Sequence, residues 1–202
     1  MTEDGFVYLD EALPGARWDA KYPGPDNFMG RPAAGYRVNR VVLTRKAASA
    51  LAQARVRLRG EKLDIFVFDA YRPARAVADF CSWAADASDT KRKSIHYPNT
   101  DKSELIPQGY IASMSTHSRG SAIDLTLCDP DGRLLDMGGI FDFMDPLSWH
   151  GTPFVNEVQT QNREKLRHTM LSCGFEDYER EWWHYRLADE PYPHTYFDFE
   201  ID

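Results

Sequence analysis

Residues 63–70 read LDIFVFDA, a run of mainly apolar, β-branched and aromatic side chains that predicts a buried β-strand. Residues 71–73 (YRP) end this strand, and their proline suits the first turn of a helix over residues 74–85. Ahead of the strand, residues 44–59 are rich in Ala, Leu and Arg, and they begin at Thr44, a residue type that caps helix N-termini. A helix, a buried strand and a second helix are therefore expected at the centre of the fold.

The remaining segments mix strands and helices without regular alternation. Residues 86–110 are polar, and they form a longer connection than is typical, which predicts a lid or the wall of a site. Residues 111–127 are expected to form two short strands that are interrupted at 118–120 (SRG). A helix is predicted over 156–173 and an aromatic-rich strand over 182–187. This order favours an α+β fold with a mainly antiparallel sheet flanked by helices.

The chain has 202 residues, 43% of them hydrophobic and 27% charged, which fits a single domain over 1–202. Residues 1–40 are expected to form an irregular but ordered N-terminal arm that packs on this domain. The reason lies in the stretch 14–36, which combines Pro and Gly with aromatic side chains that disordered linkers lack. The three cysteines are widely spaced, so they do not indicate a disulfide framework.

Charge and hydropathy narrow the possible partners. A net charge of -7 argues against a nucleic-acid or anionic-membrane surface. No apolar stretch approaches the ~20 residues that span a bilayer. The N-terminus also lacks the basic and apolar regions of a signal peptide, so we expect a cytoplasmic protein.

The first segment that suggests chemistry is STHSRGSAID, residues 115–124. It holds His117 and Asp124, and Gly120 between them permits a tight reversal of the chain. Two strands around that reversal would bring both side chains to one end of a sheet. An imidazole nitrogen and a carboxylate oxygen are both good zinc ligands, at about 2.0–2.2 Å.

The second segment is EWWH, which places Glu181 three residues before His184. On an ideal strand these two side chains would point to opposite faces. Glu181 is therefore expected just before the strand, on a bend that returns its carboxylate toward a metal held by His117, Asp124 and His184. Three protein ligands leave a position for water, which is the catalytic pattern. A nearby unligated carboxylate can take the proton of that water and pass it to the leaving amine.

Hydrolysis of a peptide bond also needs a cation or donor for the oxyanion. Arg72 follows the buried strand directly and is the best candidate, with Asp69 placed to orient its guanidinium. Taken alone, each of these residues also fits an ordinary surface or ion-pair role. A serine-hydrolase interpretation of Ser115 and His117 fails because the sequence has no G-x-S-x-G. The other histidines are not expected to be ligands, although His150 remains a candidate for lining the site.

At these residues the chain resembles the D-alanyl-D-alanine dipeptidases of the VanX type, within the zinc D,D-peptidase family (peptidase family M15). The resemblance implies one Zn²⁺ per chain on His117, Asp124 and His184, with Glu181 as base and Arg72 as oxyanion stabiliser. It also implies a fold shared with D,D-carboxypeptidases and the hedgehog signalling domain. The matching segments are 18–22, 26–28, 69–73, 115–124, 141–145, 181–184 and 189–199.

The resemblance further implies how a dipeptide is held. Ser115 and Tyr22 match positions that hold the free carboxylate of the substrate, and Asp142 matches a position near its free amine. A longer peptide would leave Asp142 unpaired, and unpaired buried charge costs several kcal/mol. The implied reaction is zinc-dependent hydrolysis of D-Ala-D-Ala.

Three questions stay open at this point. A D,D-carboxypeptidase acting on peptidoglycan peptides would keep the same metal, and a hedgehog-like zinc module would keep it without catalysis. Resistance to glycopeptide antibiotics and recycling of cell-wall D-alanine use the same chemistry. The sequence does not indicate an oligomeric state.

Overall fold

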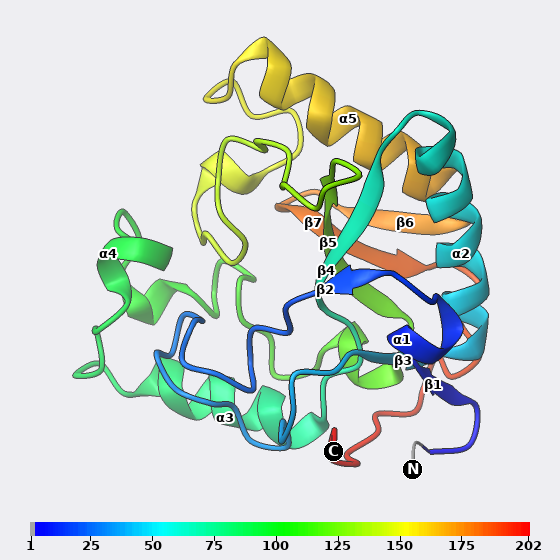
Figure 1. Ribbon diagram of the computed structural model, residues 1–202. Helices are drawn as coiled ribbons and strands as arrows, with labels where there is room; N and C mark the ends of the chain where they lie inside the picture. The colour runs from blue at the N-terminus through cyan, green and yellow to red at the C-terminus, as the bar shows by residue number, and fades with distance from the viewer. Residues whose placement is uncertain (1–2) are drawn as a thin grey trace.

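The computed structural model describes residues 3–202, and a five-stranded sheet lies at its centre (Figure 1). Its strand order is β2-β4-β5-β7-β6. All neighbours are antiparallel except β2, which runs parallel to β4. This architecture confirms the predicted α+β fold with a mainly antiparallel sheet. The strands are β2 (Arg17–Trp18), β4 (Asp64–Asp69), β5 (Ala122–Cys128), β6 (Phe175–Tyr178) and β7 (Glu181–Leu187).

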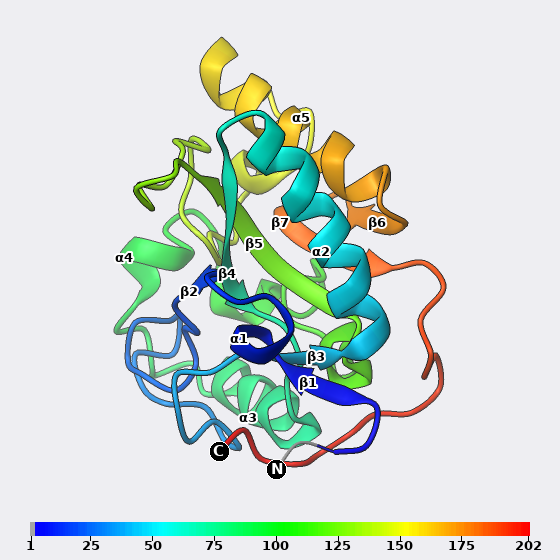
Figure 2. The same ribbon diagram turned by 45° about the vertical axis from the view of Figure 1, so that its right-hand side comes forward.

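Two long helices, α2 (Arg45–Gly60) and α5 (Glu157–Leu171), pack against each other and against the sheet (Figures 1 and 2). Both begin where the sequence predicts. The Thr44 side chain accepts a hydrogen bond from the Ala47 amide, and Asn156 forms a capping box with Gln159. These caps satisfy backbone amides that a helix start leaves without partners.

The predicted helix after the buried strand is α3 (Ala74–Ala85), which lies away from the α2–α5 layer (Figure 2). A separate two-stranded antiparallel sheet joins β1 (Phe6–Tyr8) to β3 (Val42–Thr44). The short elements are α1 (Leu9–Ala12), α4 (Lys93–His96) and three 3₁₀ helices at Lys102–Glu104, Thr116–Arg119 and Pro146–Ser148.

The prediction of two strands within residues 111–127 is wrong for its first half. Only Ala122–Cys128 is a strand, and the residues before it form bends and the 3₁₀ helix Thr116–Arg119. Ser115 begins this helix by accepting a hydrogen bond from the His117 amide, and Gly120 ends it with φ +80°. Local bonds of this kind compete with strand pairing, so the segment turns instead of extending.

The C-terminal strand prediction also needs correction. Residues 175–178 form the additional strand β6, and Glu181 is the first residue of β7 instead of preceding it. Glu181 pairs with Tyr178 across the hairpin turn, where the register becomes irregular. An irregular register re-aims side chains, which is why a carboxylate and a histidine three residues apart can face one cavity.

The N-terminal segment packs on α3 through aromatic rings. The ring of Tyr22 lies 4.9 Å from that of Phe80, and the ring of Phe28 lies 4.9 Å from that of Trp83. Cys81, Cys128 and Cys173 are free. Within residues 3–202, no helix has the length and apolar character needed to cross a membrane.

Candidate metal and active site

Three side chains converge near the N-terminal end of β5. Asp124 on β5 pairs directly with His184 on β7, and His117 comes from the 3₁₀ helix that precedes β5. His184 Nδ1 lies 3.0 Å from Asp124 Oδ1 and 3.0 Å from His117 Nε2, and His117 Nε2 lies 3.3 Å from Asp124 Oδ2. Across residues 3–202, this is the one group of three or more His, Cys, Asp or Glu side chains with ligand atoms close enough to hold a metal ion.

The surroundings of His117 determine which of its nitrogens can bind a cation. Its Nδ1 lies 2.6 Å from the carbonyl oxygen of Ala70. A carbonyl only accepts, so Nδ1 carries the proton and Nε2 keeps its lone pair. Burial lowers the pKa of His117, which favours the neutral ring.

The charge state of Asp124 suits a metal as well. Burial alone would raise its pKa, but interactions with the rings of His117 and His184 hold that pKa well below its usual value. A carboxylate and two imidazole nitrogens then point at one another across about the distance that hydrogen bonds span. These oxygen and nitrogen atoms face one another with their lone pairs, and they repel one another unless a cation or a proton lies between them. Two nitrogens and one oxygen are also a donor set that zinc accepts, so the residues fit a metal ion.

Glu181 lies beside this cluster without belonging to it. Its Oε2 is 4.0 Å from His184 Nδ1, and its side chain is only 17% exposed. Burial raises the pKa of Glu181 well above its usual value, and the charges of Asp124 and Asp142 raise it further. A carboxyl group in such surroundings can hold a proton near neutral pH.

Arg72 lies on the other side of Asp124, at the end of β4. Its Nε donates to Asp69 Oδ2 at 3.0 Å, and its Nη2 donates to Asp124 Oδ2 at 3.3 Å. Asp69 in turn accepts a hydrogen bond from the Tyr36 hydroxyl at 2.8 Å. The guanidinium group is therefore held in one orientation, with its side chain 12% exposed.

Tyr22 and Asp142 form a second polar pair in the same cavity. The Tyr22 hydroxyl donates to Asp142 Oδ2 at 2.8 Å. Burial, followed by the charge of Asp124, raises the pKa of Asp142 to about 8. Asp142 also has φ +58°, a conformation that non-glycine residues adopt rarely and mostly at functional sites.

One cavity of about 290 Å³ brings eight of the nine predicted site residues together. Asp69 does not line it and lies behind Arg72 instead. His150 is not among the lining residues, which answers the question that the sequence left open. The predicted residues on the cavity wall are Tyr22, Arg72, Ser115, His117, Asp124, Asp142, Glu181 and His184.

The cavity wall includes residues that the sequence did not single out. Tyr110 comes from the long polar segment that was expected to wall a site, and Phe80 from α3. Trp183 lies inside the EWWH motif and was assigned only to strand packing. Aromatic residues are common in cores, so nothing in their spacing distinguished these three.

The sequence profile of the peptidase M15 family, described as D-ala-D-ala dipeptidase, matches residues 2–202. A D-alanyl-D-alanine dipeptidase of Enterococcus faecalis is 50% identical over 200 residues, which are 98% of this chain and 99% of the relative. A D-alanyl-D-alanine dipeptidase of Streptomyces coelicolor is 46% identical over 202 residues, 100% of both chains. A solved structure of the vancomycin-resistance D,D-dipeptidase VanXYg with a D-Ala-D-Ala phosphinate analogue has 18% identity and a TM-score of 0.42, over 77% of this chain and 54% of that one. The chain described here belongs to the peptidase M15 family of D-Ala-D-Ala dipeptidases.

Proposed function

We propose that the protein is a zinc-dependent dipeptidase that hydrolyses D-alanyl-D-alanine to two molecules of D-alanine. The observation that carries this proposal is the juxtaposition of a three-donor cluster with Glu181 and Arg72 in one small cavity. A metal-binding module without catalysis would need the three metal donors but neither Glu181 nor Arg72. Membership of the peptidase M15 family supports the same substrate class.

His117, Asp124 and His184 would hold the zinc ion. When bound, zinc polarises the scissile carbonyl and lowers the pKa of a water molecule toward ~7. Glu181 takes the proton of the attacking water and delivers it to the leaving amine. Its raised pKa supports this role, because burial makes the carboxylate a stronger base toward the proton of the attacking water.

Arg72 stabilises the negative charge that develops on the carbonyl oxygen in the transition state. A fixed guanidinium is suited to this because it needs no reorganisation when the charge appears. Support comes from the ion pair with Asp69, which holds the Arg72 side chain at the cavity wall. Asp69 is accordingly a positioning residue.

Asp142 and Ser115 recognise the two ends of the substrate. Asp142 binds the free ammonium group, which would restore the negative charge that burial disfavours. Ser115 binds the free carboxylate. A tyrosine hydroxyl has one proton to donate, and Tyr22 donates it to Asp142, so holding the substrate carboxylate would require Tyr22 to break that bond. The small cavity favours a dipeptide over a longer chain.

The test compares hydrolysis of D-Ala-D-Ala and N-acetyl-D-Ala-D-Ala by the zinc-loaded protein, with L-Ala-L-Ala as a stereochemical control. Acetylation removes the ammonium charge that Asp142 would bind, and we expect kcat/KM to fall by at least about 10²-fold. Equal rates on both D,D substrates would contradict the dipeptidase proposal and favour a D,D-carboxypeptidase. Failure to hydrolyse either substrate would favour a non-enzymatic zinc module. A cytoplasmic location stays a prediction.

A further inference from the structure

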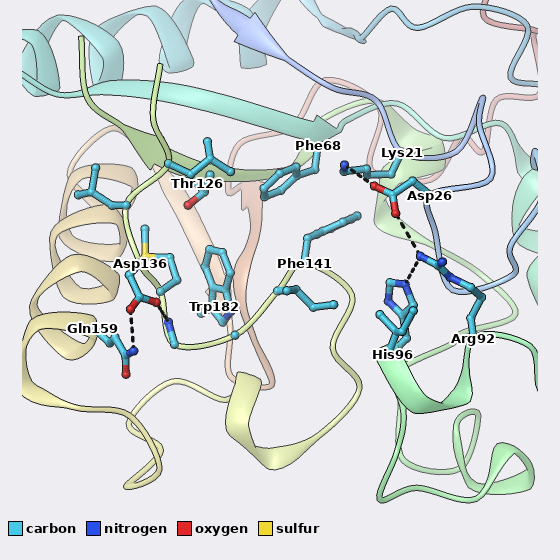
Figure 3. Close-up of a pocket in the computed structure, with 17 residues that line it drawn as sticks. Lys21, Asp26, Phe68, Arg92, His96, Thr126, Asp136, Phe141, Gln159 and Trp182 are labelled. Carbon is cyan, nitrogen blue, oxygen red and sulfur yellow. Dashed lines mark hydrogen bonds and ion pairs between the residues drawn. The ribbon is translucent and has the colours of Figure 1, made fainter. Parts of the chain in front are cut away.

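His96, the last residue of α4, contacts Asp142 without lining the candidate active site. It lines a second cavity, of about 550 Å³, where Figure 3 shows it beside Arg92. Phe141 lines this second cavity, and the next residue, Asp142, lines the candidate active site. The two cavities share no lining residue, so His96 reaches residue 142 from outside the site that would hold a substrate.

The His96 ring donates a hydrogen bond to the main chain at Asp142. Its Nδ1 lies 3.1 Å from the Asp142 carbonyl oxygen, and its Nε2 lies 3.5 Å from Arg92 Nη2. A carbonyl accepts and a guanidinium donates, so the ring proton is on Nδ1 and Nε2 accepts. Burial lowers the pKa of His96, which favours this neutral ring. His96 therefore offers Asp142 a hydrogen-bond donor and no charge.

The Asp142 carbonyl depends on this donor. Within residues 3–202 it accepts no other hydrogen bond. His96 is 5% exposed and Asp142 is 8% exposed, so the bond is buried. A buried carbonyl without a partner is unfavourable. Loss of the donor would therefore favour rotation of the peptide that follows Asp142 toward another partner.

The backbone of Asp142 also needs to be held in place, because its φ is +58°. L-residues adopt this left-handed conformation at a cost, and it persists where the surrounding structure fixes it. The direction of the side chain follows from the backbone. Its Oδ2 accepts from the Tyr22 hydroxyl at 2.8 Å, whereas Oδ1 accepts no hydrogen bond from the described residues, 3–202. Oδ1 is therefore available for a substrate ammonium group.

The main chain on either side of this contact is attached independently of the His96 ring. The Met144 amide donates to the His96 carbonyl at 2.7 Å, and the Thr100 hydroxyl donates to the Met144 carbonyl at 3.1 Å. These bonds involve residue 144, whereas the ring of His96 bonds to the main chain at Asp142. Changing only the ring should therefore release Asp142 while the two segments stay joined.

We propose that His96 is a positioning residue for substrate recognition, whose Nδ1–H fixes the main chain of Asp142 so that its carboxylate meets the free ammonium group of the dipeptide. The inference rests on the proposed function, in which Asp142 binds that group. Since His96 does not line the candidate active site, it acts only through Asp142. Its effect should therefore be confined to the affinity for substrates with a free amine.

His96→Leu and His96→Asn are matched variants, because the two new side chains have nearly the same shape. Both lose the contact with Arg92, but Asn keeps an amide N–H near the position of Nδ1, and Leu has no donor. Neither variant removes a charge, because the His96 ring is neutral. The values of kcat and KM are measured with zinc-loaded protein for D-Ala-D-Ala and for propionyl-D-alanine, which lacks only the amino group.

His96→Leu is expected to raise KM for D-Ala-D-Ala about fivefold, which is the effect of one hydrogen bond. Its kcat should change by less than about twofold, because the ammonium group is bound equally in the ground state and the transition state. For propionyl-D-alanine, kcat/KM should also stay within about twofold of the wild-type value, since Asp142 has no ammonium to bind. His96→Asn should keep KM for D-Ala-D-Ala within about twofold of wild type.

Equal hydrolysis of the two substrates by the wild-type protein would contradict the proposed function, and this inference with it. If the wild-type protein prefers D-Ala-D-Ala, three results overturn this inference alone. They are an unchanged KM in His96→Leu, an equal rise of KM in His96→Leu and His96→Asn, and an equal fall of kcat/KM for both substrates in His96→Leu.

The wild-type protein provides a test that does not depend on the folding of His96→Leu. Imidazole ¹⁵N NMR shows which ring nitrogen carries the proton, and the His96 signals are identified by their loss in His96→Asn. We expect the proton on Nδ1, where it faces the Asp142 carbonyl. A proton on Nε2 would overturn the proposal.

Discussion

Among the residues of the candidate site, Glu181 has surroundings that differ most from those of an ordinary glutamate. It is largely buried, and its neighbours Asp124 and Asp142 are also acids, so its pKa is raised. Such surroundings destabilise the charged form of Glu181 and do not stabilise the folded protein. Buried, strongly perturbed carboxyl groups in cavities are candidates for catalysis for this reason.

Replacing Glu181 with glutamine should separate proton transfer from metal binding. Glu181→Gln keeps the size of the side chain and leaves the three donors intact, so zinc content should remain that of the wild type. The value of kcat should fall by about 10²–10⁴-fold, the usual contribution of a general acid–base group. Zinc is measured by elemental analysis and kcat by D-alanine release.

His117→Ala is the matched control for Glu181→Gln. It removes one of three donors, so zinc content should fall together with activity. Full activity in Glu181→Gln would contradict the proposed base. Unchanged zinc in His117→Ala would contradict the proposed ligand set.

At the scale of secondary-structure elements, a buried ion pair joins α2 to β4. Arg55 Nε donates to Asp64 Oδ1 at 2.7 Å, and both side chains are less than a tenth exposed. Arg55 also donates to the carbonyls of Leu13 and Pro14, which ties the N-terminal segment to the same point. Since β4 ends at Asp69, three residues before Arg72, this pair anchors the strand that leads to the oxyanion candidate.

Asp64→Asn should destabilise the protein by about 3–5 kcal/mol at neutral pH, because it leaves Arg55 buried without its counter-charge. Chemical denaturation measures the free energy of unfolding. Asp189→Asn is the control, since the Lys46–Asp189 pair is exposed and its loss should change stability by less than about 1 kcal/mol. A loss of stability of similar size in Asp64→Asn and Asp189→Asn would contradict the role of Asp64 as the buried counter-charge of Arg55.

The same pair predicts a pH dependence. Burial opposes ionisation of Asp64, but hydrogen bonds from Arg55, the Ile65 amide and Arg59 lower its pKa overall. A lowered folded-state pKa stabilises the protein above the unfolded value of about 4, and this contribution disappears as pH falls through the folded value. The stability gap between wild type and Asp64→Asn should therefore narrow below about pH 4. If the difference in stability between wild type and Asp64→Asn stays constant down to about pH 2, this pH dependence is contradicted.

At the scale of the whole molecule, the three candidate metal donors connect segments that are distant in the sequence. His117 lies before β5, Asp124 within it and His184 on β7, so the donors meet only in the folded chain. A ligand that binds only the folded state stabilises it by mass action. Zinc should therefore raise the thermal midpoint of unfolding.

Free zinc at 100 times its Kd should add about 2.7 kcal/mol of stability. For a chain of this size that corresponds to roughly 5–10 °C in the midpoint, measured by calorimetry with and without chelator. The His117→Ala variant should show a much smaller rise. Equal midpoints with and without zinc in the wild-type protein would contradict a metal site at these donors.

Local sequence was sufficient for most of the helices and for one strand. The boundaries of α2, α3 and α5 follow from Thr44, Pro73 and Asn156, because caps and proline act through bonds and angles within one turn. Buried strand β4 was recognisable from its apolar run. The chemistry of the site was also readable, since the donor types stand in compact motifs at 115–124 and 181–184.

The sequence by itself therefore determined the family, the main helices and the types of side chain available for catalysis. Only the tertiary structure decided that Glu181 begins β7 and that Phe141 and Asp142 line two different cavities. These features depend on strand register and on contacts between residues far apart in the chain. Periodicity and capping describe neighbours within a few residues, so they carry no information about which distant side chains meet.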